Sequence, residues 1–341
     1  MNPRESLRTA PHLARLLLGW GALLGTCLLL GLTVVTYAKQ PDRFAAFTLM
    51  PVWIWGGIGI AAALAGLLLC RSRIAWLPAA AWLVVILATA DEARTLANFR
   101  HDPPRPGPAR PHLGEPVVRV ITANLDLHPA PELARWKPDI VLLQDTWPHQ
   151  IRRIALDLFG EDGSIHIHGT NAIITRWEIL EHDAKPDQRT HQATIRIPAS
   201  GATFKVVNVH LVSAATDLSL WRRSVWTGHR VNRAIRLREL ETAISALESS
   251  TGFPAAPAIL GGDFNAPPGD AIYRRIEEQF HDAHPAAGRR PGNTYHRRFP
   301  ILRIDRIHAT PHFTPVRSRT DIAARSDHRF VIADFLFAPS P

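Results

Sequence analysis

The chain has 341 residues, more than one small domain needs and enough for about two units at roughly 150 residues each. Its 39 Lys and Arg exceed its 30 Asp and Glu, but residues 1–100 hold 9 and 4 of these, so the remainder is only slightly basic and does not indicate a nucleic-acid-binding domain. The only cysteines, Cys27 and Cys70, lie in apolar segments, which excludes a disulfide framework or a cysteine-ligated zinc site in the rest of the chain.

Three long apolar segments occupy the N-terminal third. Residues 16–37 are uncharged and long enough for about 30 Å of helix, the thickness of a bilayer core. Residues 51–70 form a second such run, and residues 74–90 form a third, which contains Pro78 and is close to the lower length limit for a span. A cleaved signal peptide has a shorter apolar core and is not followed by two more. We therefore expect a membrane region over residues 1–100 with three helices.

Arginines beside these segments set their expected orientation. Arg4, Arg8 and Arg15 precede the first segment, and Arg71 and Arg73 lie in the turn between the second and the third. Basic residues of short loops stay on the cytoplasmic side of a membrane. Three spans would make this a multi-pass protein of the cell membrane with everything after residue 91 outside the cytoplasm. With only two spans, the rest of the chain would lie in the cytoplasm.

A proline-rich segment, residues 101–116, is typical of an extended linker. Beyond it, residues 117–338 alternate between short apolar runs, typical of strands, and longer amphipathic runs, typical of helices. Strands are expected at residues 117–124, 139–144, 171–175, 193–197, 203–211, 258–264, 301–308 and 329–337. Helices are expected at residues 131–136, 149–159, 219–247 and 270–280. Because the helices fall between the strands, the pattern indicates a β core covered by helices.

One expected strand delivers a carboxylate and an amide to the same face. Residues 259–265 read Ile-Leu-Gly-Gly-Asp-Phe-Asn, and alternation along a strand places Asp263 and Asn265 on one side. The paired Gly261 and Gly262 allow another group to approach the backbone closely. This arrangement holds two polar groups rigidly at a strand tip, facing a ligand.

Other strand ends carry polar groups of the same kind. They are Asn124, Asp126, Asp145, His210, Asp305, Asp327 and His328. Oxygen ligands without sulfur suit Mg²⁺, Mn²⁺ or Ca²⁺, and imidazoles beside carboxylates suit proton transfer or the stabilisation of phosphoryl oxygens. Each residue considered alone also has a purely structural interpretation. Asp145 would cap the next helix, His210 would be a hydrogen-bonded histidine of the sheet, and Asp305 would pair with a neighbouring arginine. Their joint occurrence at apolar strand ends favours one shared site.

The order of these motifs resembles the endonuclease/exonuclease/phosphatase superfamily of DNase I-like proteins. The resemblance covers about residues 117–338 and rests on Asn124, Asp145, His210, the Gly-Asp-Phe-Asn motif, the Arg-Ile-Asp motif and the Ser-Asp-His motif. It implies a four-layer α/β sandwich, in which two packed, mainly antiparallel β-sheets are flanked by helices, here preceded by an all-α membrane segment of three helices. It also implies hydrolysis of a phosphoester by in-line attack of water.

The resemblance implies a role for each catalytic residue. Asp263 is expected to orient or deprotonate the attacking water, and Asn265 to position the water or the phosphate. His328, paired with Asp305, is expected to face the phosphate, and His210 resembles the second histidine of the DNase I-like branch.

The resemblance also implies a metal site with Asn124, Asp145 and Asp327 as ligands and Asp126 assisting. Mg²⁺ is the expected cofactor, with Mn²⁺ or Ca²⁺ as alternatives. Arg176 stands where the family often has a phosphate-contacting arginine, or else it is a solvated surface residue. One departure concerns Asp145, because the family usually has Glu there, and the shorter carboxylate weakens the metal site or requires a bridging water.

The sequence thus predicts a membrane-anchored, metal-dependent hydrolase of the phosphodiesterase, nuclease or phosphatase type. Nucleic acid, a lipid headgroup and a sugar phosphate all remain open as the substrate; the bilayer is the other expected partner, and no protein partner is inferred. The alternative is a catalytically weakened domain that binds a phosphate-bearing ligand or a partner at the membrane, which the shortened Asp145 carboxylate keeps open.

Overall fold

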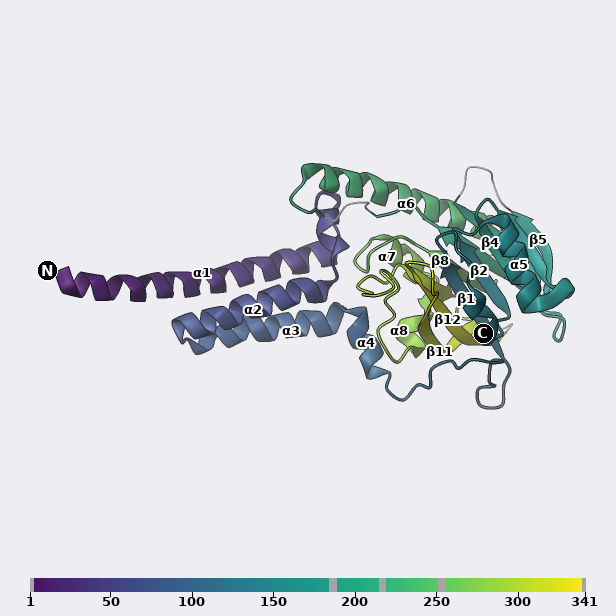
Figure 1. The fold of residues 1–341 in the computed structure, drawn as a ribbon, viewed down its shortest axis with the longest axis horizontal. Coiled ribbons are helices and arrows are strands. Elements are labelled where there is room, and N and C mark those ends of the chain that lie inside the picture. The colour runs from purple at the N-terminus through teal and green to yellow at the C-terminus, as the bar shows by residue number, and fades with distance from the viewer. Residues whose placement is uncertain (1–2, 184–188, 215–218, 251–255, 339–341) are drawn as a thin grey trace.

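The computed structural model describes residues 3–183, 189–214, 219–250 and 256–338. Its N-terminal part is a bundle of three helices that run side by side away from the rest of the molecule (Figure 1). These are α1 (Pro3–Lys39), α2 (Val52–Cys70) and α3 (Trp76–Thr89). Short 3₁₀ helices, η1 (Asp42–Leu49) and η2 (Arg73–Ala75), connect them, and α4 (Asp91–Ala97) follows.

Small residues and two polar contacts hold the bundle together. The Trp82 ring lies against Gly59, where a Cβ atom would come within 2.0 Å of it. The Thr26 hydroxyl donates to the Gly59 carbonyl at 2.7 Å and accepts from the Trp82 indole at 2.9 Å. Large apolar side chains such as Leu28 and Leu68 remain exposed on the outside of the bundle. Residues 11–39 and α2 are long and apolar enough to cross a membrane, and residues 73–89 form a shorter apolar helix.

Two six-stranded sheets make up the rest of the fold. The first has the order β11-β12-β1-β2-β4-β3, and the second has the order β5-β6-β7-β8-β10-β9. The first contains β1 (Val117–Asn124), β2 (Ile140–Gln144), β3 (Ser164–His168), β4 (Asn171–Thr175), β11 (Phe313–Ile322) and β12 (Arg329–Phe337). The second contains β5 (Glu178–Asp183), β6 (Thr190–Arg196), β7 (Thr203–His210), β8 (Ala258–Asp263), β9 (His281–Asp282) and β10 (Asp305–Ala309). Both sheets are mixed, because β1–β2 and β7–β8 pair in parallel and the other described pairs are antiparallel.

Three buried apolar clusters hold the two sheets and the helices that cover them together as layers. One lies between the two sheets and includes Val120, Phe204 and Phe335. A second lies under η3 (Pro131–Trp136) and α5 (Pro148–Phe159), and a third under α6 (Arg223–Ser250) and α7 (Ile272–Glu277). Two short elements, η4 (Gly160–Asp162) and α8 (Ala283–Ala287), complete the fold. Two packed sheets with helices on their outer faces confirm the expected four-layer sandwich.

The elements depart from the sequence prediction in several places. All eight predicted strands are present, but β10 begins only at Asp305, because Arg303 and Ile304 lie outside the regular ladder. The helix predicted at residues 270–280 shortens to α7, the one at residues 131–136 is a 3₁₀ helix, and α6 begins at Arg223. The prediction missed β3, β5, β9 and β11.

The helical bundle contacts the sandwich directly through hydrogen bonds. The Asp91 carboxylate accepts two hydrogen bonds from Arg303, at 2.7 and 3.1 Å, and Arg303 is only 2% exposed. The Gln40 side chain donates to the Gly269 carbonyl at 2.8 Å, and Arg233 of α6 donates to the Gln40 carbonyl at 2.8 Å. The proline-rich segment also lies against the sandwich, where the buried Arg119 holds its backbone carbonyls.

Candidate active site

The predicted site forms where the two parallel strand pairs end. Asn124 of β1 lies opposite Gln144 of β2, and His210 of β7 lies opposite Asp263 of β8. A cavity of about 550 Å³ opens at these ends. Of the predicted residues, it is lined by Asn124, Asp126, Asp145, His210, Asp263, Asn265, Asp327 and His328.

Asp263 is the most constrained of these side chains. It is 1% exposed and accepts hydrogen bonds from the Asn124 amide at 2.9 Å, the Asn265 amide at 3.1 Å and the Asn265 backbone N–H at 2.8 Å. Gly262 makes this position possible, because its φ is +144° and a Cβ atom there would lie 1.9 Å from the Val209 carbonyl oxygen. The predicted close approach to the backbone therefore comes from the neighbouring strand β7.

His328 and Asp305 form a buried charged pair beside Asp263. The His328 Nδ1 lies 2.9 Å from the Asp305 carboxylate. Burial opposes charge on His328, but the carboxylates of Asp305, Asp263 and Asp327, with Asp305 first among them, together outweigh burial and raise the pKa of His328 to about 10. Burial, followed by repulsion from Asp305, raises the pKa of Asp263 to about 6. The site thus places a cationic imidazole beside a carboxyl group that changes protonation near neutral pH.

His210 lies between two carboxylates on the other side of the cavity. Its Nε2 is 3.6 Å from Asp145 and 3.9 Å from Asp263. Asp126, Asp145 and Asn265 all have left-handed backbones, with φ of +46°, +42° and +49°. Asp and Asn tolerate this conformation better than most residues, and such strain concentrates at functional sites. The left-handed turns bring the polar side chains back over the strand ends.

The donor set fits a hard divalent cation. Four carboxylates and the Asn124 amide line one cavity, and one oxygen of Asp305 is buried without a hydrogen-bond partner. Asp263, Asp305 and His328 each offer a potential ligand atom within 4.8 Å of the others. Because the Nδ1 of His328 is engaged by Asp305, we attribute this group to an ion pair. The more open Asp145 carboxylate, 40% exposed, is the better place for a cation.

The sequence did not assign a role to several residues that support the site. The Gln144 amide donates to Asn208 at 2.6 Å, and the Ser326 hydroxyl donates to the Asn124 carbonyl at 2.8 Å. The Tyr295 ring lies 5.1 Å from the His328 ring, and Leu49 of η1 also lines the cavity. Polar residues inside apolar strands were the available signal for Gln144 and Asn208, whereas no local pattern marks Leu49.

Arg176 does not line the cavity. It follows β4 at the opposite end of the sheet, where its guanidinium lies 2.6 Å from the Asp139 carboxylate at the start of β2. The antiparallel pairing of β2 and β4 explains this, because the end of β4 lies beside the beginning of β2. In this structure Arg176 is therefore a half-exposed arginine paired with Asp139.

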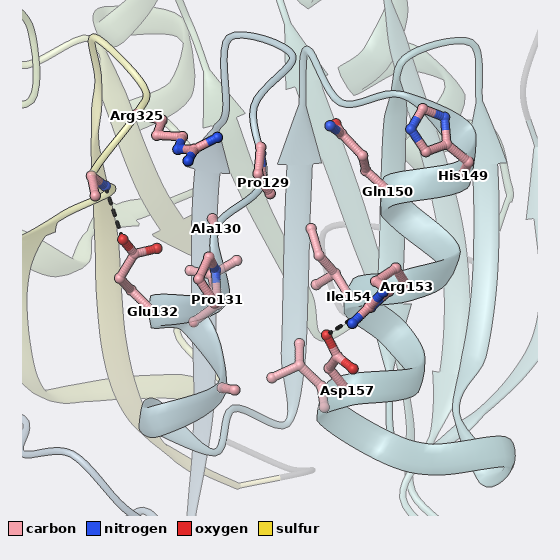
Figure 2. Close-up of a pocket in the computed structure, with 14 residues that line it drawn as sticks. Pro129, Ala130, Pro131, Glu132, His149, Gln150, Arg153, Ile154, Asp157 and Arg325 are labelled. Carbon is pink, nitrogen blue, oxygen red and sulfur yellow. Dashed lines mark hydrogen bonds and ion pairs between the residues drawn. The ribbon is translucent and has the colours of Figure 1, made fainter.

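A separate groove of about 580 Å³ lies between η3 and α5 (Figure 2). Figure 2 shows two interactions among its polar groups: Glu132 accepts from the Ala324 backbone, and Arg153 pairs with Asp157. Its described lining does not bring acids and histidines together. The cavity at the strand ends, which brings four carboxylates and two histidines together, is therefore the candidate site.

Comparison with known proteins places the chain in a family. A model of the endonuclease/exonuclease/phosphatase family matches residues 97–328. An endonuclease/exonuclease/phosphatase family protein from Bacteroides thetaiotaomicron shares its fold, with a TM-score of 0.50 and 18% identity over 65% of this chain and 98% of that chain. The mannosyl-6-phosphatase Bt3783 of B. thetaiotaomicron VPI-5482 matches with a TM-score of 0.49 and 17% identity, over 64% of this chain and 100% of that chain. A humanised TDP2 of D. rerio matches with a TM-score of 0.48 and 18% identity, over 64% of this chain and 98% of that chain. A search of curated proteins found no match. The chain belongs to the endonuclease/exonuclease/phosphatase family.

Proposed function

We propose that this protein is a membrane-anchored, divalent-metal-dependent phosphoesterase that hydrolyses its substrate by in-line attack of water. The observation that carries this proposal is the buried Asp263 carboxylate, fixed by Asn124 and Asn265 beside the charged pair of His328 and Asp305. A carboxyl group whose pKa is about 6 accepts a proton readily near neutral pH. A cationic imidazole at the same place stabilises negative charge on phosphoryl oxygens.

Each catalytic residue has a separate role in the proposed reaction. Asp263 accepts a proton from the attacking water, while Asn124 and Asn265 hold the carboxylate in one orientation. The Nε2 of His328 points to the side where Asp327 lies, 3.7 Å away, and Asp305 keeps the ring protonated and oriented. His210, placed between Asp145 and Asp263, contributes a second imidazole.

Asn124, Asp145 and Asp327, assisted by Asp126, would hold the cation, for which Mg²⁺ is our first choice and Mn²⁺ or Ca²⁺ the alternatives. The side-chain oxygen of Asn124, Oδ1, accepts one hydrogen bond, from the Asp126 backbone N–H at 3.1 Å, and keeps a lone pair for a metal. When bound, a divalent cation supplies charge neutralisation for the phosphoryl group and the leaving oxygen.

The experiment uses the full-length chain in detergent with a panel of phosphomonoesters and phosphodiesters, with Mg²⁺ or Mn²⁺ and with excess EDTA. We expect turnover that EDTA abolishes and added cation restores. Undiminished hydrolysis in EDTA would overturn the metal requirement. Metal-dependent binding of a phosphate-bearing ligand without hydrolysis would instead support the weakened, ligand-binding alternative.

We further propose that all three helices span the membrane and that the sandwich lies outside the cytoplasm. The Trp53 indole near the start of α2 donates to Glu92, just after α3, at 3.0 Å, so the two helices begin and end at the same level. The connection between α2 and α3, which carries Arg71 and Arg73, lies at the end of the bundle away from the sandwich (Figure 1). Arg15 donates to the Leu69 carbonyl, in the last turn of α2, at 2.9 Å. A C-terminal reporter that works only in the cytoplasm should stay inactive, and its activity would refute this topology.

A further inference from the structure

The cavity has two chemically different sides. Its lining combines the acids and histidines at the strand ends with four apolar residues, which we call the apolar wall: Leu49, Pro267, Leu302 and Ile304. A small, fully polar phosphoester would make no contact that uses the apolar character of these side chains. A substrate with a phosphate at one end and an apolar portion at the other would cover both sides.

Leu49 connects this apolar wall to the helical bundle along the chain. It is the last residue of η1, and α2 begins three residues later, at Val52. The Phe47 ring of η1 stacks on Trp55 of α2, with 4.1 Å between the ring centroids. If α2 spans the bilayer, its first turn marks the bilayer surface, where tryptophans concentrate. The cavity therefore opens within a few residues of that surface.

Two exposed aromatic side chains project near the same end. Trp221, in the turn before α6, and Phe299, in the hairpin between Tyr295 and Leu302, are each 83% exposed. Each has an exposed arginine nearby, Arg223 and Arg298 respectively. Neither aromatic lines the cavity, but an exposed aromatic next to an arginine suits the headgroup region of an anionic membrane.

Both aromatic segments are anchored to the bundle end. The carbonyl of Leu220 accepts a hydrogen bond at 2.7 Å from Trp226, whose ring lies 6.3 Å from the Phe44 ring in η1. On the other side, Asn293 donates to the Pro300 carbonyl at 3.3 Å and to Glu92 at 3.0 Å. Glu92 in turn accepts from Trp53 of α2. These contacts hold both segments at the level where α2 begins and α3 ends.

We propose that the substrate is a phosphoester carried by a membrane lipid, whose phosphate enters the acid-and-histidine side of the cavity while its apolar portion lies along the Leu49 wall. This inference rests on the proposed phosphoesterase function. Water adds to the phosphorus, the bond from phosphorus to the ester oxygen breaks, and the leaving oxygen takes up one proton. The reaction requires no other co-reactant.

The test compares matched lipid and water-soluble esters with the full-length chain in mixed detergent micelles. Phosphatidic acid is paired with glycerol 3-phosphate, and phosphatidylglycerol with glycerophosphoglycerol, because each pair shares its polar group. Bis(p-nitrophenyl) phosphate and p-nitrophenyl phosphate report on the chemistry without any lipid. We expect kcat/KM for at least one lipid to exceed that for its soluble partner by about a hundredfold or more, since apolar burial is available only to the lipid.

The variants Trp221→Ala and Phe299→Ala test the membrane contact itself. We expect each to lower lipid turnover by about tenfold, the loss that accompanies withdrawal of one large apolar side chain from the membrane. Hydrolysis of the p-nitrophenyl esters should change less than twofold. Leu156→Ala is the matched control, because Leu156 is 55% exposed on α5, away from the cavity, and should affect neither reaction.

The outcomes separate the two proposals. No hydrolysis of any ester with any cation would overturn the phosphoesterase function itself. Hydrolysis of soluble esters as efficiently as their lipid partners would overturn only the lipid inference. Lipid turnover unaffected by both aromatic substitutions would also overturn it, since the membrane would then not contact the proposed surface.

Discussion

Substituting Asp263 by Asn separates the chemistry of the site from its stability. The change keeps the shape of the side chain and removes the proton acceptor. General-base catalysis contributes about 10²–10⁴-fold, so kcat should fall by that factor, which is about 3–5 kcal/mol of activation free energy. This loss is expected for any ester that the full-length enzyme hydrolyses.

Although kcat should fall, the free energy of unfolding of Asp263→Asn at pH 7.5 should not fall with it. The pKa of Asp263 is raised from 3.8 to about 6, so ionisation of the folded protein above pH 6 costs it about 3 kcal/mol, as an order of magnitude. A neutral Asn removes that cost, but its NH₂ group must face one of the donors on Asn124 or Asn265, which costs about 1–3 kcal/mol. Stability at pH 7.5 should therefore remain unchanged or rise.

The sign of the effect depends on pH. A raised carboxyl pKa stabilises the folded state at low pH, and that contribution is lost as pH rises through about 6. Any stability gained by Asp263→Asn should therefore be present at pH 7.5 and absent at pH 4. Thermal melts in EDTA at both pH values, with kcat measured in Mg²⁺, check this. The matched control is Asp157→Asn, an exposed carboxylate on α5 that pairs with Arg153.

Two results would refute this reasoning. A folded Asp263→Asn enzyme with kcat within about threefold of the parent would remove Asp263 from the mechanism. A variant with a much lower melting temperature at pH 7.5 would show that the hydrogen bonds to the carboxylate outweigh the cost of burying its charge.

Three further predictions concern other parts of the molecule. Asp91→Asn should lower the melting temperature of the full-length protein in detergent, because it weakens the pair with the buried Arg303; an unchanged melt would mean that the bundle contributes little to the fold. Asp145→Glu should keep or raise metal affinity in a titration while costing about 1 kcal/mol of stability, because Glu adopts a φ of +42° less readily than Asp; weaker metal binding would refute the expectation that the shorter carboxylate weakens the site. Burial lowers the pKa of His308 to about 3 and of His284 to about 4, so stability that is present above pH 6.5 should be lost as pH falls toward 4; flat acid melts would contradict this.

The sequence revealed the interior strands of both sheets and missed all four edge strands. The eight predicted strands correspond to β1, β2, β4, β6, β7, β8, β10 and β12, which have a neighbour on each side. The missed β3, β5, β9 and β11 lie at the sheet edges. In β5 almost every side chain is exposed, and β11 contains Pro315 and alternating charged residues. An edge strand is not required to be apolar, so hydrophobic periodicity has little to detect there.

The meeting of the candidate residues in one place was predictable where strand alternation and motif order determine their positions. The acids, amides and histidines at the ends of β1, β2, β7 and β8 do meet in one cavity. Contacts between segments far apart in the chain leave no local pattern, so the approach of η1 to the cavity could not be anticipated. The sequence analysis assigned Leu49 to the expected membrane region. In the structure Leu49 lines the cavity.

The stretch Arg303-Ile304-Asp305-Arg306 shows why neighbours in sequence misled one interpretation. A carboxylate between two arginines was open to a simple local ion pair, but Asp305 is bonded to His328 instead. Asp305 and Arg306 are successive residues of β10, so their side chains point to opposite faces. Arg303 and Arg306 contact Asp91, at 2.7 and 3.5 Å, on the face away from the cavity. One short segment thus carries the charged pair of the candidate site on one side and the contact with the helical bundle on the other, so the bundle is part of the unit that shapes the site.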